Sequence, residues 1–185
     1  MSHEIRTPLN GVVGFTELLK NSGGMTDIQK EYAQNSYISA NSLLGIINDI
    51  LDFSKIEAGK LELDEIKTDI IELAEQACDI VKFNINKKNL ELLLNISHDV
   101  PRFAVVDPLR LKQIIINLLG NAVKFTDSGE IEIKIGFNKN DDSNGEFFFS
   151  VRDTGIGIPE KQKNNLFQAF SQADKSVSRK YGGTG

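Results

Sequence analysis

The sequence predicts a protein in two parts, a helical hairpin over residues 1–64 followed by a mixed α+β domain over residues 65–185. Apolar residues recur at spacings of three and four through the first part, which is the period of a helix packed on one side. In the second part, helical periods are interspersed with short runs typical of strands. Their order is not the regular strand–helix–strand repeat of a doubly wound parallel sheet. We therefore expect an α+β fold for the second part.

The first helix of the hairpin is expected near the start of the chain, over about 20 residues. Pro8 lacks an amide hydrogen and should bend this helix. Residues 21–25 then break the helical pattern, and Thr26 followed by Gln29 predicts a capping box that starts a second helix. The mostly apolar stripe of the first helix consists of Ile5, Leu9, Val12, Thr16 and Leu19.

The second helix carries an apolar stripe that is wider than one partner helix can cover. Two hairpins packed together would cover such a surface, so we expect a dimeric four-helix bundle. The alternative is a monomeric helical pair that caps another domain. The positions that step by three and four are Ala40, Leu43, Ile47, Ile50 and Ser54, and the stripe is widened by Leu44, Ile46, Leu51 and Phe53.

The second part is expected to begin near residue 65, where the pattern changes to loose alternation over residues 61–70. Residues 71–83 return to a helical period, and residues 90–96 are typical of a buried strand. A short strand is expected at residues 103–106.

A long helix should begin after this strand, because Asp107 can cap its first turn. Residues 130–135 alternate strictly, and residues 147–151 predict a further strand. The polar residues 141–145 between them favour a hairpin loop. The apolar positions of the long helix are Leu111, Ile114, Ile115, Leu118, Leu119 and Val123.

Composition narrows the class of protein. The 40% apolar and 25% charged residues are ordinary for a soluble globular domain. A net charge of -5 and a pI near 5.1 argue against nucleic-acid binding, because there is no basic stripe to meet a phosphate backbone. Cys78 is the sole cysteine, which rules out a disulfide within the chain and a cysteine-based metal cluster. No apolar run reaches the roughly 18 residues of a membrane span, so this chain should make no direct membrane contact.

Two asparagines on the long helix are candidate metal ligands. Asn117 and Asn121 stand at positions i and i+4, so they project from one helix face. If a triphosphate supplies anionic oxygens, two amide oxygens can complete the shell of hard ligands that Mg²⁺ prefers without adding charge. Lys124 could reach the same phosphates. Taken alone, these residues could also be surface amides and a solvated lysine at a helix end.

Residues 153–159, with the sequence DTGIGIP, form a candidate nucleotide site. Asp153 ends a predicted strand, and its carboxylate could accept a hydrogen bond from the amino group of adenine. Gly155 and Gly157 allow the backbone to approach a flat ligand closely. Glycine pairs are common in turns and do not by themselves indicate a nucleotide site. The prediction of such a site depends on the paired asparagines of the preceding helix. The segment matches neither a P-loop nor a dinucleotide-binding fingerprint.

Over nearly the whole chain, these motifs in this order resemble those of the bacterial sensor histidine kinases of two-component systems. Residues 2–10 (SHEIRTPLN) resemble the histidine box, residues 117–126 (NLLGNAVKFT) the asparagine box, and residues 153–159 the first glycine box. Residues 166–170 (LFQAF) resemble the phenylalanine box. The resemblance implies a two-layer α/β sandwich, as in the gyrase, chaperone and mismatch-repair ATPases.

The same resemblance implies that ATP, bound with Mg²⁺, phosphorylates His3, whose neutral imidazole attacks the γ-phosphoryl group. Glu4 would orient or deprotonate the ring, and Thr7 would position water when the phosphorylated partner is dephosphorylated. Pro8 stands where the resemblance implies the proline that kinks this helix in the family. The nucleotide-binding residues would be Asn117, Asn121, Lys124, Asp153, Gly155 and Gly157, with the metal on Asn117 and Asn121.

At its end the chain resembles the start of a second glycine box, in which Gly183 and Gly185 would bind the nucleotide. Because the rest of that box is missing, we expect an ATP-binding domain that lacks its last helix and strands, as in an excerpt of a larger protein. Residues 162–181 are expected to form a mobile lid. Phe167 and Phe170 could belong either to the phenylalanine box or simply to the core.

The resemblance also implies a homodimer through the hairpins and a response regulator receiver domain as partner. The receiver domain would dock around Gly11, Gly14, Phe15 and Leu18, although Phe15 and Leu18 could instead lie in the bundle core. A cytoplasmic location is expected. It stays open whether the parent protein is anchored in the inner membrane or carries a fused receiver domain.

Two other functions stay open at this point. A phosphatase or phosphotransfer module without effective ATP binding would agree with the missing end of the domain. A purely structural dimerisation and relay piece would tolerate replacement of His3 and of both asparagines. Nucleotide affinity separates the first alternative from a kinase, and replacement of His3 separates the second.

Overall fold

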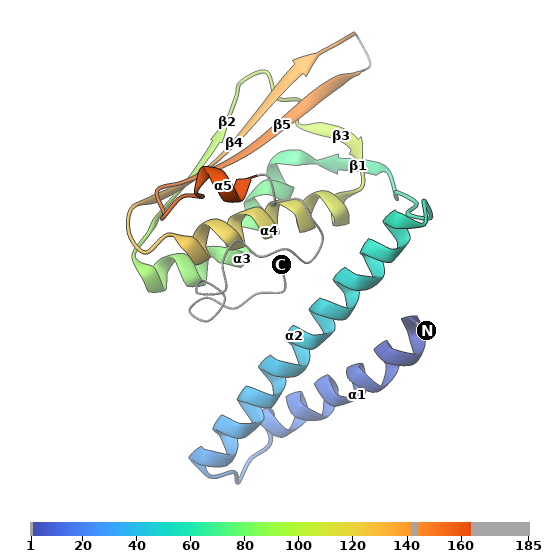
Figure 1. The fold of residues 1–185 in the computed structure, drawn as a ribbon, viewed down its shortest axis with the longest axis vertical. Helices are drawn as coiled ribbons and strands as arrows, with labels where there is room; N and C mark the ends of the chain where they lie inside the picture. The colour runs from blue at the N-terminus through green and yellow to red at the C-terminus, as the bar shows by residue number, and fades with distance from the viewer. Residues whose placement is uncertain (1, 142–143, 164–185) are drawn as a thin grey trace. The chain divides into compact units, whose positions relative to one another are not determined.

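The computed structural model describes residues 2–141 and 144–163, with side chains left out at residues 2–4 and 161–162. Two compact units make up the chain, Met1–Glu62 and Leu63–Gly185 (Figure 1). The first is a helical hairpin and the second is a mixed α/β unit, so the predicted order of the two folds is confirmed.

The first unit consists of helix α1, Ser2–Asn21, and helix α2, Asp27–Glu57, which lie side by side (Figure 1). The predicted capping box is confirmed: Gln29 N–H donates to Thr26 Oγ1 over 3.3 Å, and Thr26 N–H donates to Gln29 Oε1 over 2.9 Å. Pro8 lies inside α1, where it removes one helical hydrogen bond. The two helices are joined by Arg6 Nη2, which donates to Asn48 Oδ1 over 3.3 Å.

Most large apolar side chains of this hairpin stay exposed in one chain. Among the described residues of α2, Ala33 and Ala40 are the buried ones. The exposed set comprises Ile5, Val12, Phe15, Leu18 and Leu19 on α1, and Ile28, Tyr32, Ile38, Leu43, Ile50, Phe53 and Ile56 on α2. One hairpin therefore cannot cover the wide stripe that the sequence displays.

The second unit contains five strands and three helices among its described residues. In chain order they are β1 (Ile66–Asp69), α3 (Ile70–Lys88), β2 (Glu91–Ile96), β3 (Phe103–Val106), α4 (Pro108–Phe125), β4 (Glu130–Lys139), β5 (Gly145–Asp153) and α5 (Glu160–Lys163). All four predicted strands and both long helices are present. Helix α3 continues past its predicted end at Phe83, because Ile85 extends the buried stripe to the left-handed cap at Asn89.

The strands form two sheets. Strands β4 and β5 pair as the predicted antiparallel hairpin, and β4 also pairs in parallel with β2, so the order is β2-β4-β5. Strands β1 and β3 form a separate antiparallel pair. The parallel pairing was not predicted. It requires a crossover between β2 and β4, which helix α4 supplies.

Helices α3 and α4 cover one face of the three-stranded sheet (Figure 1). The large, fully buried side chains of this core come from α4 and β4, and helix α3 adds the small residues Ala74 and Ala77: the large ones are Ile115, Leu119, Ile131, Ile133 and Ile135. This two-layer packing agrees with the expected sandwich. Of the apolar positions predicted on α4, however, Ile114 and Leu118 are exposed. The apolar pattern therefore continues around α4 beyond the face that meets the sheet.

Aspartates cap both long helices of this unit. Asp107 caps α4, as predicted, by accepting Arg110 N–H over 3.0 Å. Asp69 caps α3 by accepting the N–H groups of Ile71 and Glu72, each over 3.1 Å. Its second oxygen lies 2.8 Å from Arg102 Nε. The Arg102 guanidinium, together with the N–H of Glu72, holds the pKa of Asp69 below its ordinary value.

We expect Asp69→Asn to lower the urea midpoint of unfolding at pH 7, because the amide keeps the capping oxygen but loses the ion pair with Arg102. A carboxylate with a lowered native pKa stabilises the fold above its ordinary pKa of about 3.9 and loses this contribution as the pH falls. The difference from wild type should therefore narrow towards about pH 3. Asp79→Asn, at an exposed ion pair with Lys82, is the control and should change little. Equal midpoints of Asp69→Asn and wild type at pH 7 would contradict the expectation.

Candidate functional site

The C-terminal end of α4 and the segment after β5 meet directly. Ile156 N–H donates to the carbonyl of Phe125 over 3.2 Å, and Thr154 N–H donates to the carbonyl of Glu130 over 3.2 Å. The first bond attaches the glycine-containing segment to the end of the helix that carries the asparagines, and the second attaches it to the first residue of β4. The structure thus brings together two motifs that stand far apart in the sequence. We call the place where they meet, residues 124–126 and 153–157, the α4–β5 junction.

The glycine at position 155 is dictated by this close approach. A Cβ at Gly155 would lie 2.3 Å from the carbonyl oxygen of Phe125 and 2.8 Å from Asp153 Oδ1. No rearrangement of a flexible side chain can relieve the contact with a backbone carbonyl. Gly157 is a glycine for another reason, because its φ of +68° lies in the left-handed region, with open space where a Cβ would be.

Asp153 is the last residue of β5, as predicted, and its side chain is exposed. Its Oδ1 accepts the N–H of Gly155 over 2.9 Å and faces the hydroxyl of Thr126 at 3.5 Å. Thr126 is fully buried. The carboxylate is therefore restrained by protein donors on one oxygen while it stands at an exposed strand end.

Asn117 and Asn121 both lie on the exposed side of α4, one turn apart. Their orientation follows from packing, because Ile115, Leu119 and Ala122 face the core. Two amide groups are thus presented on one face of the helix whose end contacts the glycine segment. They have the chemistry of hard, neutral oxygen ligands.

Lys124 lies in the last turn of α4, and its ammonium stands 5.1 Å from the ring centroid of Phe125. It is half-buried. The residue is therefore part of the α4–β5 junction, as the sequence suggested, with its charge over an aromatic ring.

Three residues that belong to this junction or contact it were missed by sequence reasoning. Thr126 was part of a recognised motif but had no predicted role. Thr154 packs against Gly129, whose φ is +108°, and its hydroxyl accepts the N–H of Glu130 over 3.0 Å. Lys88 reaches the end of α4 from another helix. A threonine after a helix is only a weak sequence signal for a functional role. The contacts of Lys88 span more than 30 residues of sequence, and no local pattern predicts them.

The candidate phosphoacceptor segment belongs to the first unit. His3 and Glu4 lie in the first turn of α1, and their side chains fall outside the described residues. Thr7 follows one turn later on an exposed position. Gly183, Gly185, Phe167 and the predicted lid from residue 164 onward also lie outside the described residues.

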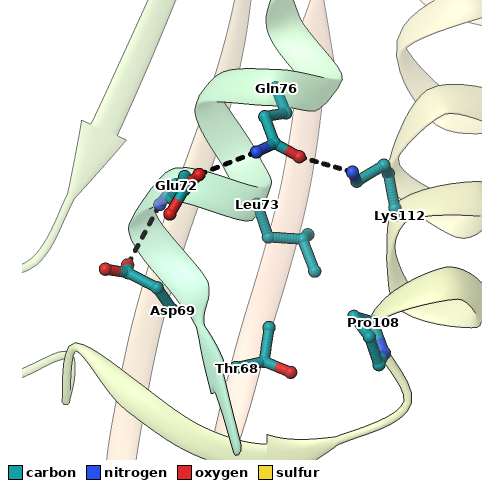
Figure 2. Close-up of a pocket in the computed structure, with 7 residues that line it drawn as sticks. All are labelled: Thr68, Asp69, Glu72, Leu73, Gln76, Pro108 and Lys112. Atoms are coloured by element: carbon teal, nitrogen blue, oxygen red, sulfur yellow. Dashed lines mark hydrogen bonds between the residues drawn. The ribbon is translucent and has the colours of Figure 1, made fainter.

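A groove of about 170 Å³ lies at the other end of α4 (Figure 2). Its polar groups pair with each other: Gln76 Nε2 donates to Glu72 Oε1 over 2.9 Å, and Lys112 Nζ donates to Gln76 Oε1 over 2.5 Å. None of its lining residues is a candidate nucleotide ligand, and Asn117 and Asn121 lie about 7.5 and 13.5 Å further along the helix axis than Lys112, at a rise of 1.5 Å per residue. The groove is therefore separate from the candidate nucleotide site. Its lining residues are Thr68, Asp69, Glu72, Leu73, Gln76, Pro108 and Lys112.

Comparison with known proteins gives a consistent result for both units. Residues 1–59 match the His Kinase A (phospho-acceptor) domain, and residues 106–185 match the Histidine kinase-, DNA gyrase B-, and HSP90-like ATPase family. The signal transduction histidine-protein kinase BarA of Escherichia coli (strain K12) is 49% identical over the whole chain. The chain spans 20% of the length of that relative. Among the described residues, no helix is long and apolar enough to cross a membrane.

Two solved structures have similar folds. Full-length ShkA in complex with AMPPNP has a TM-score of 0.77 at 35% identity, covering 96% of this chain and 37% of ShkA. The histidine kinase ThkA in complex with the response regulator protein TrrA has a TM-score of 0.58 at 25% identity, covering 92% of this chain and 48% of ThkA. Both units and their order therefore agree with one family: the chain belongs to the sensor histidine kinases, with a phosphoacceptor domain followed by an ATPase domain.

Proposed function

We propose that this chain is the core of an ATP-dependent protein-histidine kinase that phosphorylates itself on His3 and passes the phosphoryl group to an aspartate of a receiver domain. The observation that carries the proposal is the α4–β5 junction. There a restrained carboxylate, a glycine with no room for a side chain and two exposed amides lie on connected elements. The use of ATP favours a cytoplasmic location for this part of the protein.

The adenine base is the proposed ligand of Asp153. Its amino group would donate to the carboxylate, whose Oδ1 is already oriented by the N–H of Gly155. The bond from Ile156 N–H to the carbonyl of Phe125 keeps the backbone at residue 155 close to the helix end. Because residue 155 is glycine, no side chain would stand between the base and the protein. Gly157, with open space around it, would allow an equally close approach.

Asn117 and Asn121 are the proposed ligands of Mg²⁺. Neutral amide oxygens one turn apart on an exposed helix face fit a metal whose other ligands are phosphate oxygens. Bound Mg²⁺ would neutralise negative charge on the phosphates. Lys124 in the next turn would add a positive charge to the same region. Gly183 and Gly185 stay predicted contacts of the nucleotide.

In the proposed reaction, a neutral ring nitrogen of His3 attacks the γ-phosphorus of ATP. A nitrogen–phosphorus bond forms, the bond between the γ-phosphorus and the bridging oxygen breaks, and ADP leaves with the electron pair. Glu4 accepts the ring proton or holds the ring in the reactive orientation. Thr7, one turn after His3, would position water for dephosphorylation of the partner.

We further propose that the hairpins form a homodimeric four-helix bundle. The support is the exposed apolar surface on both helices, which a second hairpin would cover. The proposed docking surface of the receiver domain includes Phe15 and Leu18, which are 71% and 67% exposed. The ThkA–TrrA complex supports such a partner, because ThkA is a relative bound to a response regulator.

Incubation with γ-labelled ATP and Mg²⁺ should place an acid-labile, base-stable label on the wild-type chain and none on His3→Gln. The reason is that a phosphorylated imidazole hydrolyses in acid, and glutamine cannot form it. His98→Gln is the matched control, because His98 is the second histidine and lies after β2, so its label should equal wild type. A label that persists in His3→Gln would contradict the assignment. An unlabelled wild type that also fails to bind nucleotide would favour the phosphotransfer alternative.

Gly155→Ala should weaken the binding of AMPPNP by about tenfold or more, because the new methyl group must displace the backbone at the site. Isothermal titration calorimetry gives the affinity, and thermal unfolding checks the fold. Gly136→Ala in strand β4 is the control, since its Cβ would meet Ser97 Oγ at an ordinary 3.9 Å. If both variants bound AMPPNP like wild type, the close approach at Gly155 would have no role in nucleotide binding.

Ile50→Lys should convert the dimer into a monomer with the chain mass of 20.5 kDa, because it places a charge in the proposed bundle interface. Size-exclusion chromatography with light scattering measures this mass. Phe83→Lys, on the exposed side of α3, is the matched control and should stay dimeric. If Phe83→Lys were monomeric and Ile50→Lys stayed dimeric, the dimer interface would lie elsewhere.

A further inference from the structure

Lys88, the last residue of α3, binds the end of a different helix. Its Nζ donates to the carbonyls of Val123 over 2.8 Å, Lys124 over 3.2 Å and Thr126 over 3.0 Å. It also lies 3.5 Å from the carboxylate of Asp127. The side chain is mostly buried, with 31% exposed. All three donors of one ammonium are thus used on the C-terminal end of α4.

This arrangement compensates for the extended, rather than left-handed, conformation of the residue that ends α4. The last carbonyls of a helix have no partner within it, and the helix dipole makes that end negative. Helix α3 solves the problem with Asn89 in the left-handed conformation. Helix α4 instead ends at Thr126 in an extended conformation, with φ −108° and ψ 119°. The ammonium of Lys88 therefore supplies both the hydrogen bonds and the positive charge that this end requires.

The carbonyls that Lys88 binds flank the residue that holds the glycine segment. Phe125 lies between Lys124 and Thr126, and its carbonyl accepts the N–H of Ile156. The hydroxyl of Thr126 faces Asp153 Oδ1. A displacement of residues 124–126 would therefore move both contacts that position Asp153 and the backbone at residue 155.

We propose that Lys88 is a positioning residue of the nucleotide site, which fixes the end of α4 so that Asp153 and the glycine segment stay in the orientation that binds ATP. The inference rests on the proposed function, because it assigns the nucleotide to this junction. In this proposal Lys88 does not contact the nucleotide itself. It acts through the carbonyls at residues 124 and 126, which determine where the carbonyl of Phe125 lies.

A purely stabilising role predicts a different result from a positioning role. A stabilising contact changes the free energy of unfolding, so its loss speeds amide exchange throughout the unit where exchange requires global unfolding. A positioning contact changes the local opening of the junction. Its loss should therefore speed exchange of the Ile156 N–H, which bonds to Phe125, while the amides of β4 keep their wild-type rates.

The experiment compares Lys88→Met, which keeps the length of the side chain but removes all donors, with Lys88→Arg, which restores them. Lys82→Met is the control, because Lys82 lies on the same helix in an exposed ion pair with Asp79 at 3.4 Å. The full chain is used throughout. AMPPNP affinity is measured by calorimetry with Mg²⁺ present, and amide exchange is measured by NMR without nucleotide.

Lys88→Met is expected to weaken AMPPNP binding by about tenfold and to speed exchange of the Ile156 amide by a similar factor. Lys88→Arg should recover most of the affinity and most of the protection from exchange. Lys82→Met should match wild type. Unchanged affinity and exchange in a folded Lys88→Met, or equal acceleration of all amides, would overturn the proposal. If the wild type itself binds no AMPPNP, the proposed function fails, and the exchange at Ile156 still decides whether Lys88 positions the junction. If Lys88→Met does not fold, Lys88→Leu, which also lacks donors, takes its place.

Discussion

The geometry of the candidate site depends on one backbone carbonyl, that of Phe125. It accepts the N–H of Ile156, and its oxygen lies where a side chain at residue 155 would have to be. The register of the sheet brings the two segments to this point, because Asp153 pairs with Ile131 at the start of β4. The turn from α4 into β4 is short. The strand end and the helix end are therefore held within one hydrogen-bonded corner.

Packing of the core decides which side of α4 is available for chemistry. The parallel pairing of β2 with β4 requires a crossover, and α4 provides it while burying Ile115 and Leu119 against the sheet. Once these residues face inward, Asn117 and Asn121 must face outward. Their exposure is thus a consequence of the hydrophobic core, and the Lys88 contacts then fix the end of the same helix. Affinity for a nucleotide would depend both on the exposed asparagines and on the fixed position of the helix end.

Local signals in the sequence predicted most elements, since capping and alternation act within a few residues. The capping residues Thr26 and Asp107 and the strand Phe103–Val106 were predicted correctly. Non-local features were not predictable in this way. The parallel pair β2–β4 and the reach of Lys88 to residues 123–126 join segments that only tertiary packing brings together. For the candidate site, the motifs could be located, but the contacts that orient Asp153 required the structure.

In the proposed function, ATP binds at the junction of α4 and β5 rather than in the groove at the start of α4. An NMR titration of the full chain with AMPPNP and Mg²⁺ tests this directly, because side-chain amides report on both places. We expect large shifts at the backbone of Gly155 and the side-chain amides of Asn117 and Asn121, with the side-chain amide of Gln76 in the groove unchanged. Shifts at Gln76 without shifts at Gly155 would contradict it.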